Sequence, residues 1–246
     1  MSMSKFLGIL LLFCIHAHLY GQQTVTDSLI KLISISKDDS NKVNAQILLS
    51  TEFRGNNPGE ALKYALEAKY LAERINYPKG RAYAYKGLGL VYVLQGRYVE
   101  TIENYEMAFA IFDSLGDKSG IANILSNEGT VYYNQADDAK ALELYLKALN
   151  VAEQTTDSVR IATILLNIGA VYSKKPPTYN KALDNYFKAL QIGKPLDDMG
   201  IIGTANANIG EIYFFRDDDE LALKYFKEAL KNYTGTENVP YALNYI

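Results

Sequence analysis

Apolar residues recur along the chain at helical spacing, in pairs of stripes separated by short polar turns. Between residues 121 and 149, the first stripe comprises Ile121, Ile124, Leu125, Gly129 and Tyr132. The second stripe follows the polar turn 135–138 and comprises Ala141, Leu142, Tyr145, Ala148 and Leu149. Both stripes have the i, i+3, i+4, i+7 spacing of a helix that buries one face. No strand-like alternation persists anywhere, so the pattern predicts an all-α chain built from paired helices.

This pair of helices repeats along the chain at a nearly constant interval. A glycine occupies the same slot in four copies, Gly89, Gly129, Gly169 and Gly210. A weaker first copy has Leu49, Ser50 and Phe53 in the corresponding slots. Two columns of mostly alanine share the period: Ala61, Thr101, Ala141, Ala182 and Ala222, then Ala68, Ala108, Ala148, Ala189 and Ala229. Self-similarity at a fixed period of about 40 residues is typical of a solenoid of stacked units.

The small residues have a packing role in such a stack. A helical hairpin cannot bury its own apolar face and has to stack on the next hairpin. Glycine and alanine at the crossing points let helix axes approach to ~8–10 Å. We expect aromatic side chains to fill the space between the helices: Tyr92, Tyr132, Tyr172 and Tyr213 from the first helices, and Tyr105, Tyr145, Tyr186 and Phe226 from the second.

Polar turns mark where each helix should begin and end. The loops inside each copy are short, so the two helices of a copy should be antiparallel neighbours. Asp117, Asp157 and Asp198 stand where the first helix of a copy should begin, and we expect them to act as N-caps. Between copies, the segment from Pro195 to Asp198 predicts a turn.

The first 21 residues indicate a signal peptide. Lys5 precedes an apolar run from Phe6 to Ile15, and a cleavage point is available after Gly21. The run is shorter than the ~20 apolar residues of a membrane-spanning helix. A lipoprotein anchor would use Cys14, but the bulky residue before it departs from the usual lipobox. We therefore predict a cleaved signal peptide and a secreted or periplasmic mature chain.

Cleavage would change the chemistry available to the protein. Cys14, His16 and His18 would leave with the signal peptide, so the mature chain would have no cysteine, histidine or tryptophan. Disulfides, Ser-His-Asp triads and zinc sites with Cys or His ligands are then excluded. Removing Lys5 from the 25 basic side chains leaves 24 against 28 acidic ones, a formal net charge of −4. That balance gives no electrostatic signature for nucleic-acid binding.

The columns of small and aromatic residues resemble the tetratricopeptide repeat (TPR). The third copy matches its pattern as Gly129, Tyr132, Ala141, Tyr145 and Ala148. The resemblance covers residues from about 40 to 246 and implies an α–α superhelix of about five hairpins plus a partial sixth. The usual repeat is shorter, so this looks like a long variant with about 40 residues per repeat. Thr101 in an alanine slot and the weak first copy depart from the pattern.

The resulting domain plan has three parts. Residues 1–21 form the signal peptide, residues 22–39 a lead-in helix or linker, and residues 40–246 the repeat array. Within the array, we expect repeats at 40–76, 77–116, 117–156, 157–196 and 197–235, with a partial repeat at 236–246. Because the chain stops before a sixth glycine, we expect either a longer gene product or a partner that covers this end.

A column of asparagines suggests a binding surface. Asn127, Asn167 and Asn208 each lie two residues before a repeat glycine. The resemblance implies that the first helices line a concave groove, where an asparagine could clamp a peptide backbone by donating and accepting hydrogen bonds together. The alternative is that each amide bonds a neighbouring helix and only fastens the stack. Gly87 occupies the slot in the second copy.

Other first-helix positions complete this candidate groove. They are mixed polar and aromatic, as protein-recognition surfaces often are, although an ordinary solvated face is an open alternative. The additional positions are Lys86, Ser126, Thr130, Tyr133, Asn134, Glu211 and Phe214.

No cofactor, metal or catalytic site is predicted. The acidic run 217–220 lacks the alternating ligands and the glycine of an EF-hand loop, so we expect it to cap the following helix. The glycines recur inside helices and cannot form a phosphate-binding loop. A paired-carboxylate hydrolase would need two acids in one pocket, whereas the acids of the repeats fall mainly in turns.

The leading interpretation is therefore a non-enzymatic module that binds a peptide or protein segment outside the cytoplasm. Family resemblance implies that such arrays are often sensor regions that precede a membrane helix and a histidine kinase or DNA-binding output domain in a longer gene product. A free-standing adaptor and a self-associating assembly scaffold are the alternatives.

Overall fold

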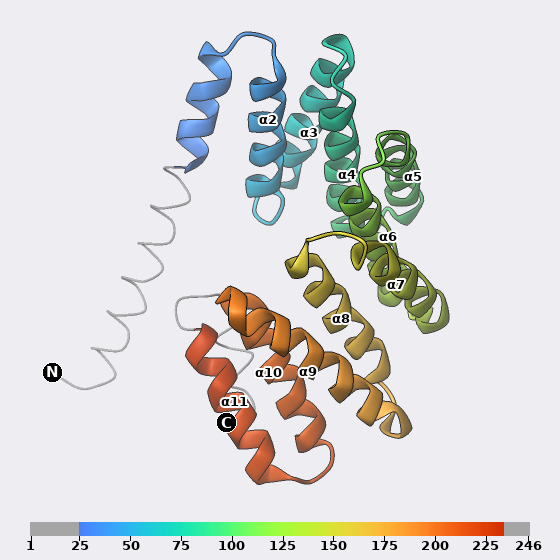
Figure 1. The fold of residues 1–246 in the computed structure, drawn as a ribbon. Coiled ribbons are helices and arrows are strands. Elements are labelled where there is room, and N and C mark those ends of the chain that lie inside the picture. The colour runs from blue at the N-terminus through green and yellow to red at the C-terminus, as the bar shows by residue number, and fades with distance from the viewer. Residues whose placement is uncertain (1–24, 234–246) are drawn as a thin grey trace, which may run out of the picture. The chain divides into compact units, whose positions relative to one another are not determined.

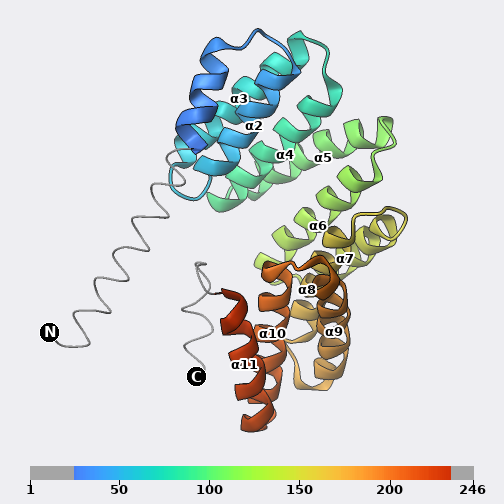
Figure 2. The ribbon, with the colours of Figure 1, turned by 60° about the vertical axis from the view of Figure 1, so that its left-hand side comes forward.

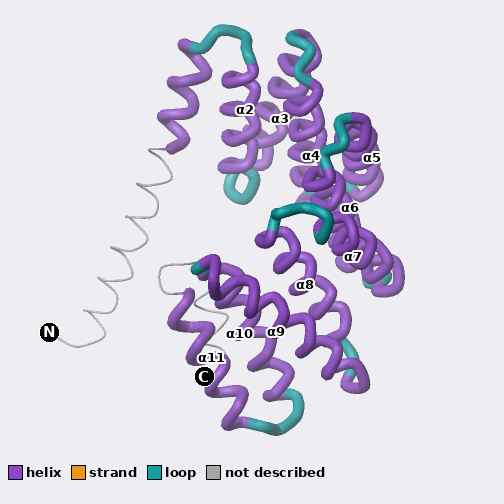
Figure 3. The backbone as a smooth tube through the Cα atoms, in the orientation of Figure 1, coloured by secondary structure: helices purple, strands orange, loops and turns teal. Residues whose placement is uncertain are grey.

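The computed structural model of the protein is helical throughout the part it describes, residues 25–233 (Figure 1; Figure 3). No strand occurs in that range. The expectation of an all-α repeat solenoid is confirmed. The predicted signal peptide at 1–21 and the partial sixth repeat at 236–246 lie outside the described residues.

The described helices pair into hairpins. After a helical segment at residues 25–35, the first helices of the hairpins are α2 (Ser40–Phe53), α4 (Pro78–Leu94), α6 (Lys118–Asn134), α8 (Ser158–Tyr172) and α10 (Met199–Phe214). The second helices are α3 (Pro58–Arg74), α5 (Tyr98–Ser114), α7 (Asp138–Ala152), α9 (Tyr179–Leu196) and α11 (Asp219–Tyr233). A short 3-10 turn, η1 (Pro176–Thr178), precedes α9.

The chain divides into two compact units between Gly116 and Asp117. The first unit contains α2 to α5, and the second contains α6 to α11. Within each unit, the two helices of a hairpin pack together and each second helix packs on the first helix that follows it (Figure 2). First helices of neighbouring hairpins also touch: α2 contacts α4 in the first unit, and α8 contacts both α6 and α10 in the second.

Each repeat glycine packs directly against an aromatic ring of its own hairpin. A Cβ placed on Gly89 would lie 2.3 Å from the Tyr105 ring, and one on Gly169 would lie 2.4 Å from the Tyr186 ring. Gly129 faces Tyr145 in the same way at 2.8 Å, and Gly210 faces Phe226 at 2.9 Å. These distances are shorter than any van der Waals contact, so a methyl group cannot be added without moving the ring.

The two alanine columns are buried at the same helix crossings. Ala61, Ala141 and Ala182 are fully buried, and Ala222 is nearly so. Every alanine of the second column is also fully buried. Thr101, the departure from the first column, is fully buried as well, and its hydroxyl donates to the backbone oxygen of Arg97 at 2.8 Å. This bond satisfies the polar atom that a buried threonine introduces.

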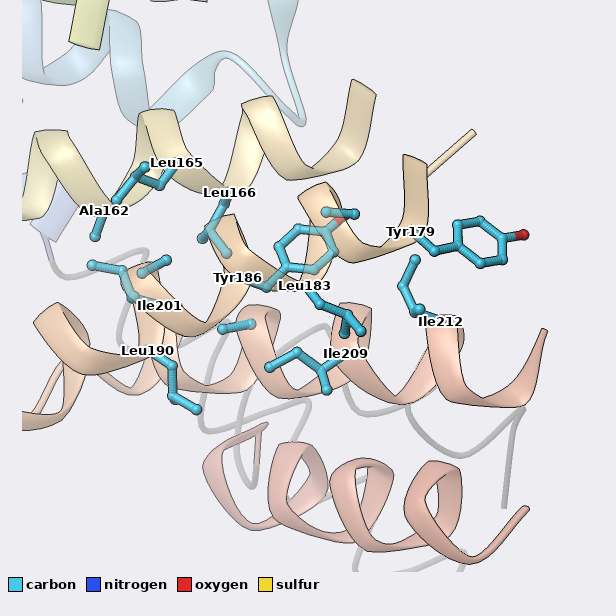
Figure 4. Packing of buried hydrophobic residues seen from close by; sticks show 13 residues of the cluster. Ala162, Leu165, Leu166, Tyr179, Leu183, Tyr186, Leu190, Ile201, Ile209 and Ile212 are labelled. Carbon is cyan, nitrogen blue, oxygen red and sulfur yellow. The ribbon is translucent and has the colours of Figure 1, made fainter. Parts of the chain in front are cut away.

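The largest described core cluster lies in the second unit, where α8, α9 and α10 meet (Figure 4). Tyr186, with only 2% of its surface exposed, lies between α8 and α9. Leu183 and Leu190 of α9 face Ile201 and Ile209 of α10, and all four are buried. A single hairpin could not cover these side chains, so the cluster exists only because hairpins stack.

Aspartate side chains begin the first helices as expected. The side chains of Asp117, Asp157 and Asp198 accept hydrogen bonds from the backbone N–H groups of Gly120, Arg160 and Ile201, each at 2.9 Å. Three N-cap predictions are therefore confirmed.

Two of the predicted turns have backbone features that the sequence pattern did not specify. Helix α9 continues through Pro195 to Leu196, and the chain reverses at Asp197, which has a left-handed conformation with φ of 52°. Pro195 lies in the last turn of the helix, immediately before this reversal. Ala136 also has a positive φ, 61°, in the turn position that Gly96 occupies in the second hairpin.

No helix within residues 25–233 combines the length and the apolar character needed to cross a membrane.

The contact between glycine and the aromatic ring can be tested with one pair of substitutions. We expect Gly169→Ala to lower the free energy of unfolding by about 1–3 kcal/mol, because the new methyl group overpacks the space next to Tyr186. Gly87→Ala is the matched control, since its nearest neighbour would be 3.8 Å from the new Cβ. Urea unfolding should show Gly87→Ala unchanged or more stable, because alanine is the better helix former. Equal destabilisation by both variants would contradict this packing role.

The buried tyrosines predict an alkaline limit to stability. Burial raises the pKa of Tyr105, Tyr145 and Tyr186 above the ordinary value near 10. Above about pH 10 the unfolded chain loses these protons while the folded chain keeps them, so the free energy of unfolding should fall as the pH rises. Tyr105→Phe keeps the ring against Gly89 but removes one ionisable group. Urea titrations at pH 7 and pH 10.8 should show a smaller alkaline loss in this variant than in the parent; an equal loss would refute the assignment.

Candidate peptide-binding surface

The candidate surface lies on the first helices of the second unit. Helices α6, α8 and α10 run side by side, with direct contacts from α6 to α8 and from α8 to α10. The second helices α7 and α9 approach each other less closely. Since the first helices are the more tightly spaced layer, the stack in this unit curves toward them. The side of the first helices that faces away from the second helices is therefore the concave face of the stack. We call this face the first-helix surface.

Helix α6 supplies five of the ten predicted residues. Ser126 is only 5% exposed, so its side chain lies at the bottom of the surface. Asn127 is half-buried, and Asn134 at the end of the helix is exposed. Thr130 is half-buried, and its hydroxyl lies 3.0 Å from the Tyr145 hydroxyl of α7. The hydrogen bond of Thr130 to α7 therefore ties it to its own hairpin.

Asn127 belongs to a small polar network. Its Nδ2 lies 2.9 Å from the side-chain amide of Asn123, one turn earlier on α6. The other polar atom of the Asn123 amide faces Arg160 of α8, within 2.8 Å of Nη2 and 3.1 Å of Nη1. The guanidinium can only donate, so the orientation that satisfies it has the Asn123 oxygen toward Arg160. In that orientation the Asn123 amide nitrogen lies 2.9 Å from the amide nitrogen of Asn127, so the two amides contact each other along one face of α6.

The remaining two asparagines differ from each other. Asn167 of α8 is half-buried and donates to Ser126 Oγ of α6 across a long 3.4 Å contact. Asn208 of α10 is also half-buried, and within residues 25–233 its side chain makes no hydrogen bond. One long bond leaves most of the hydrogen-bonding capacity of Asn167 unused. The asparagine column thus contributes only some of its hydrogen-bonding groups to contacts between helices.

The carboxyl ends of the first helices add aromatic and charged groups. The Lys174 ammonium lies 3.9 Å from the ring centroid of Tyr133, and it also forms an ion pair with Asp138 of α7. Tyr133, on α6, therefore meets a residue that follows α8. On α10, Phe214 is 45% exposed and its ring contacts that of Phe215 at 5.9 Å between centroids. Glu211, one turn before Phe214, is half-buried.

Lys86 is the one predicted residue that belongs to the first unit. It is half-buried on α4, and its ammonium lies 4.9 Å from the Tyr83 ring. Nine of the ten predicted residues therefore lie on the adjacent helices α6, α8 and α10, while Lys86 is described only within its own unit.

Sequence reasoning did not include three residues that contact members of this surface. Asn123 precedes Asn127 by four residues, which is the spacing of neighbours on one helix face and could have identified it. Arg160 gives no such signal, because its partner is on another helix. Lys174 was recognisable as a basic residue near the groove, but its contact with Tyr133 depends on how α6 and α8 pack.

The acidic run before α11 caps that helix. Asp218 accepts a hydrogen bond from the backbone N–H of Leu221 at 3.1 Å, as expected of one of these carboxylates. Across residues 25–233, no group of three or more His, Cys, Asp or Glu side chains is arranged to hold a metal ion.

Comparisons with known proteins agree with this architecture. Residues 120–175, which include α6, α7 and α8, match the family model of the tetratricopeptide repeat. No curated protein matches the chain. Among solved structures, BtubC (BKLC) from P. vanneervenii is similar with a TM-score of 0.63 and 19% identity, over 93% of this chain and 92% of that one.

Two further structures extend the similarity. Aspartyl phosphate phosphatase F from Bacillus subtilis has a TM-score of 0.66 and 13% identity, over 91% of this chain and 62% of that one. The nearly identical TPR-like repeats of the kinesin light chain type from Podosopora anserina have a TM-score of 0.59 and 13% identity, over 78% of this chain and 94% of that one. Together, these comparisons show a tetratricopeptide-repeat match at residues 120–175 and a helical-repeat fold over most of the chain.

The fastening role of Asn167 can be measured with a double-mutant cycle. Because the Asn167–Ser126 contact is long, we expect the coupling between Ser126→Ala and Asn167→Ala in the free energy of unfolding to be below about 0.5 kcal/mol. Urea unfolding of the parent, the two single variants and the double variant gives this value. A coupling above about 1 kcal/mol would show that Asn167 mainly holds α8 to α6.

Proposed function

We propose that the first-helix surface of the second unit binds an extended segment of a peptide or protein. The observation that carries this proposal is the row of half-buried amides at Asn127, Asn167 and Asn208, one on each adjacent first helix. An extended chain presents a backbone amide about every 3.3–3.6 Å, alternating donors and acceptors along its length. Asparagine side chains can satisfy both kinds of group at once.

The surroundings of the amides suit such a ligand. Arg160 lies beside Asn123 and provides a cation at one edge of the amide row. Tyr133 and Phe214 provide aromatic surface near the other ends of the helices. Mixed aromatic, amide and arginine surfaces are common at sites of protein recognition. Arrays of the TPR type generally act as interaction scaffolds, and this agrees with a non-enzymatic role.

The proposal extends to the cellular location of the protein and to its role in signalling. A cleaved signal peptide at residues 1–21 would place the array outside the cytoplasm, as a secreted or periplasmic domain. We infer that it serves as the sensor or interaction part of a signal-transduction protein whose membrane and output domains would follow Ile246. A free-standing adaptor or an assembly scaffold remains the alternative. Light scattering on residues 22–246 separates a monomeric binder from a self-assembling scaffold.

Peptide selection tests the binding surface directly. We would select ligands from a random peptide phage library on immobilised protein, residues 22–246, and measure their affinity by fluorescence anisotropy. The triple variant Asn127→Ala, Asn167→Ala, Asn208→Ala should weaken binding by more than tenfold, because each lost hydrogen bond contributes about 0.5–1.5 kcal/mol.

Asparagines on the second helices provide the matched control. Asn104 and Asn185 donate to backbone oxygens of their own helices, α5 and α9, at 2.7 Å each. The double variant Asn104→Ala, Asn185→Ala should bind the selected peptides as the parent does. Failure to select any peptide, or an equal loss in both sets of variants with unchanged circular dichroism, would contradict the proposal.

A further inference from the structure

The first unit contains a second candidate site, unrelated to the asparagine row. A pocket of about 570 Å³ opens between the helical segment 25–35 and the hairpin of α2 and α3. Ile33 of the leading segment and Leu71 of α3 provide apolar walls. The remaining lining is polar or aromatic: Ser34, Asp38, Lys42, Gln46, Glu67, Tyr70 and Arg74. A volume of this size is within the range of sites that hold small molecules.

One end of the pocket carries a surplus of positive charge. Asp38 accepts a hydrogen bond from Lys42 Nζ at 3.0 Å and also pairs with Arg74 of α3. Two cations thus share a single carboxylate. Both cations keep donors that Asp38 does not use, since an ammonium has three and a guanidinium five. This end can therefore receive an anionic group.

The other end of the pocket carries unused acceptors. Gln46 is only 4% exposed, and its Nε2 donates to Glu67 Oε2 of α3 at 3.2 Å. Its Oε1 is buried, and it accepts no hydrogen bond from any group within residues 25–233. Turning the amide would set its oxygen against the Glu67 carboxylate, so the present orientation is fixed by Glu67. Glu67 is half-buried and lines the pocket, so its carboxylate is the acceptor at this end that a ligand can reach.

The two ends are ordered along both helices. Lys42 and Gln46 are one turn apart on α2, about 6 Å along its axis at 1.5 Å per residue. Because α3 lies beside α2 in the hairpin, Arg74 pairs with Asp38 at the cationic end and Glu67 pairs with Gln46 at the other end. The charges that line the pocket are therefore separated along the hairpin, with a cationic end and an anionic end.

We propose that this pocket binds a zwitterionic dipeptide with free termini. Its carboxylate would face Lys42 and Arg74, and its ammonium would donate to the carboxylate of Glu67. An extended dipeptide spans about 7 Å, which is close to the axial separation of the two ends. Tyr70, with 60% of its surface exposed at the pocket, offers a ring for the ligand's side chains or ammonium. This site is independent of the first-helix surface.

Capped peptides test the charge requirement without changing the protein. The probe is dialanine, titrated into ¹⁵N-labelled protein of residues 22–246 and followed by amide chemical shifts. We expect saturable shifts confined to residues 33–46 and 67–74. N-acetyl-dialanine and dialaninamide each lack one charge and should bind at least tenfold more weakly, because hydrogen bonds between charged groups are the strong ones. No saturable shift, or equal affinity for capped and free forms, would overturn the proposal.

A matched pair of variants on α3 tests the residues. Glu67→Gln removes the carboxylate at the acceptor end and should weaken dialanine binding at least tenfold. Glu60→Gln removes a carboxylate of the same helix that pairs with Lys63 outside the pocket, and it should leave the affinity unchanged. Unchanged binding in Glu67→Gln would overturn the proposal. Asn167→Ala should not affect dialanine, so failure of the asparagine row as a peptide site would leave this test intact.

Discussion

The close contact between the repeat glycines and the aromatic rings is the constraint on which the hairpins depend. At Gly89, Gly129, Gly169 and Gly210, the space that a side chain would occupy is filled by a ring from the second helix. The ring can be fully buried only because the first helix has no Cβ there. Burial of such a ring contributes strongly to the apolar core, at roughly 25 cal/mol per Å² of apolar area removed from water. In these four hairpins, the missing methyl group thus allows the two helices to cross closely over the ring.

The stack then fixes which residues remain for function. The alanine columns are buried where the second helices cross their neighbours. Asp117, Asp157 and Asp198 cap the N-termini of three first helices. The inner layer of first helices is left with half-buried polar positions that packing does not require to be apolar. The asparagine row and the Asn123–Arg160 contact occupy such positions. In the first unit, positions that packing does not require to be apolar also occur near the start of the stack. They form the charged pocket that includes Gln46 and Glu67.

The sequence was sufficient for the fold because the same evidence occurs several times. Each glycine, alanine and aromatic slot is repeated at one period, so a chance match in one copy is corrected by the others. The same redundancy placed the N-caps. Repetition was less useful for two residues. The left-handed conformation of Ala136 is set by the turn and not by the type of side chain, and Pro195 lies within the last turn of α9.

The sequence alone thus determined the helical period, the small and aromatic columns and the list of residues on the first-helix surface. Tertiary structure decided which of those residues are engaged. Thr130 bonds Tyr145, Asn167 reaches Ser126, and Arg160 meets Asn123 only after the helices have packed. The pocket with Gln46 and Glu67 depends in the same way on two helices and a leading segment. Periodicity reports which face of a helix is buried, whereas contacts between side chains of different helices depend on crossing geometry that no single segment encodes.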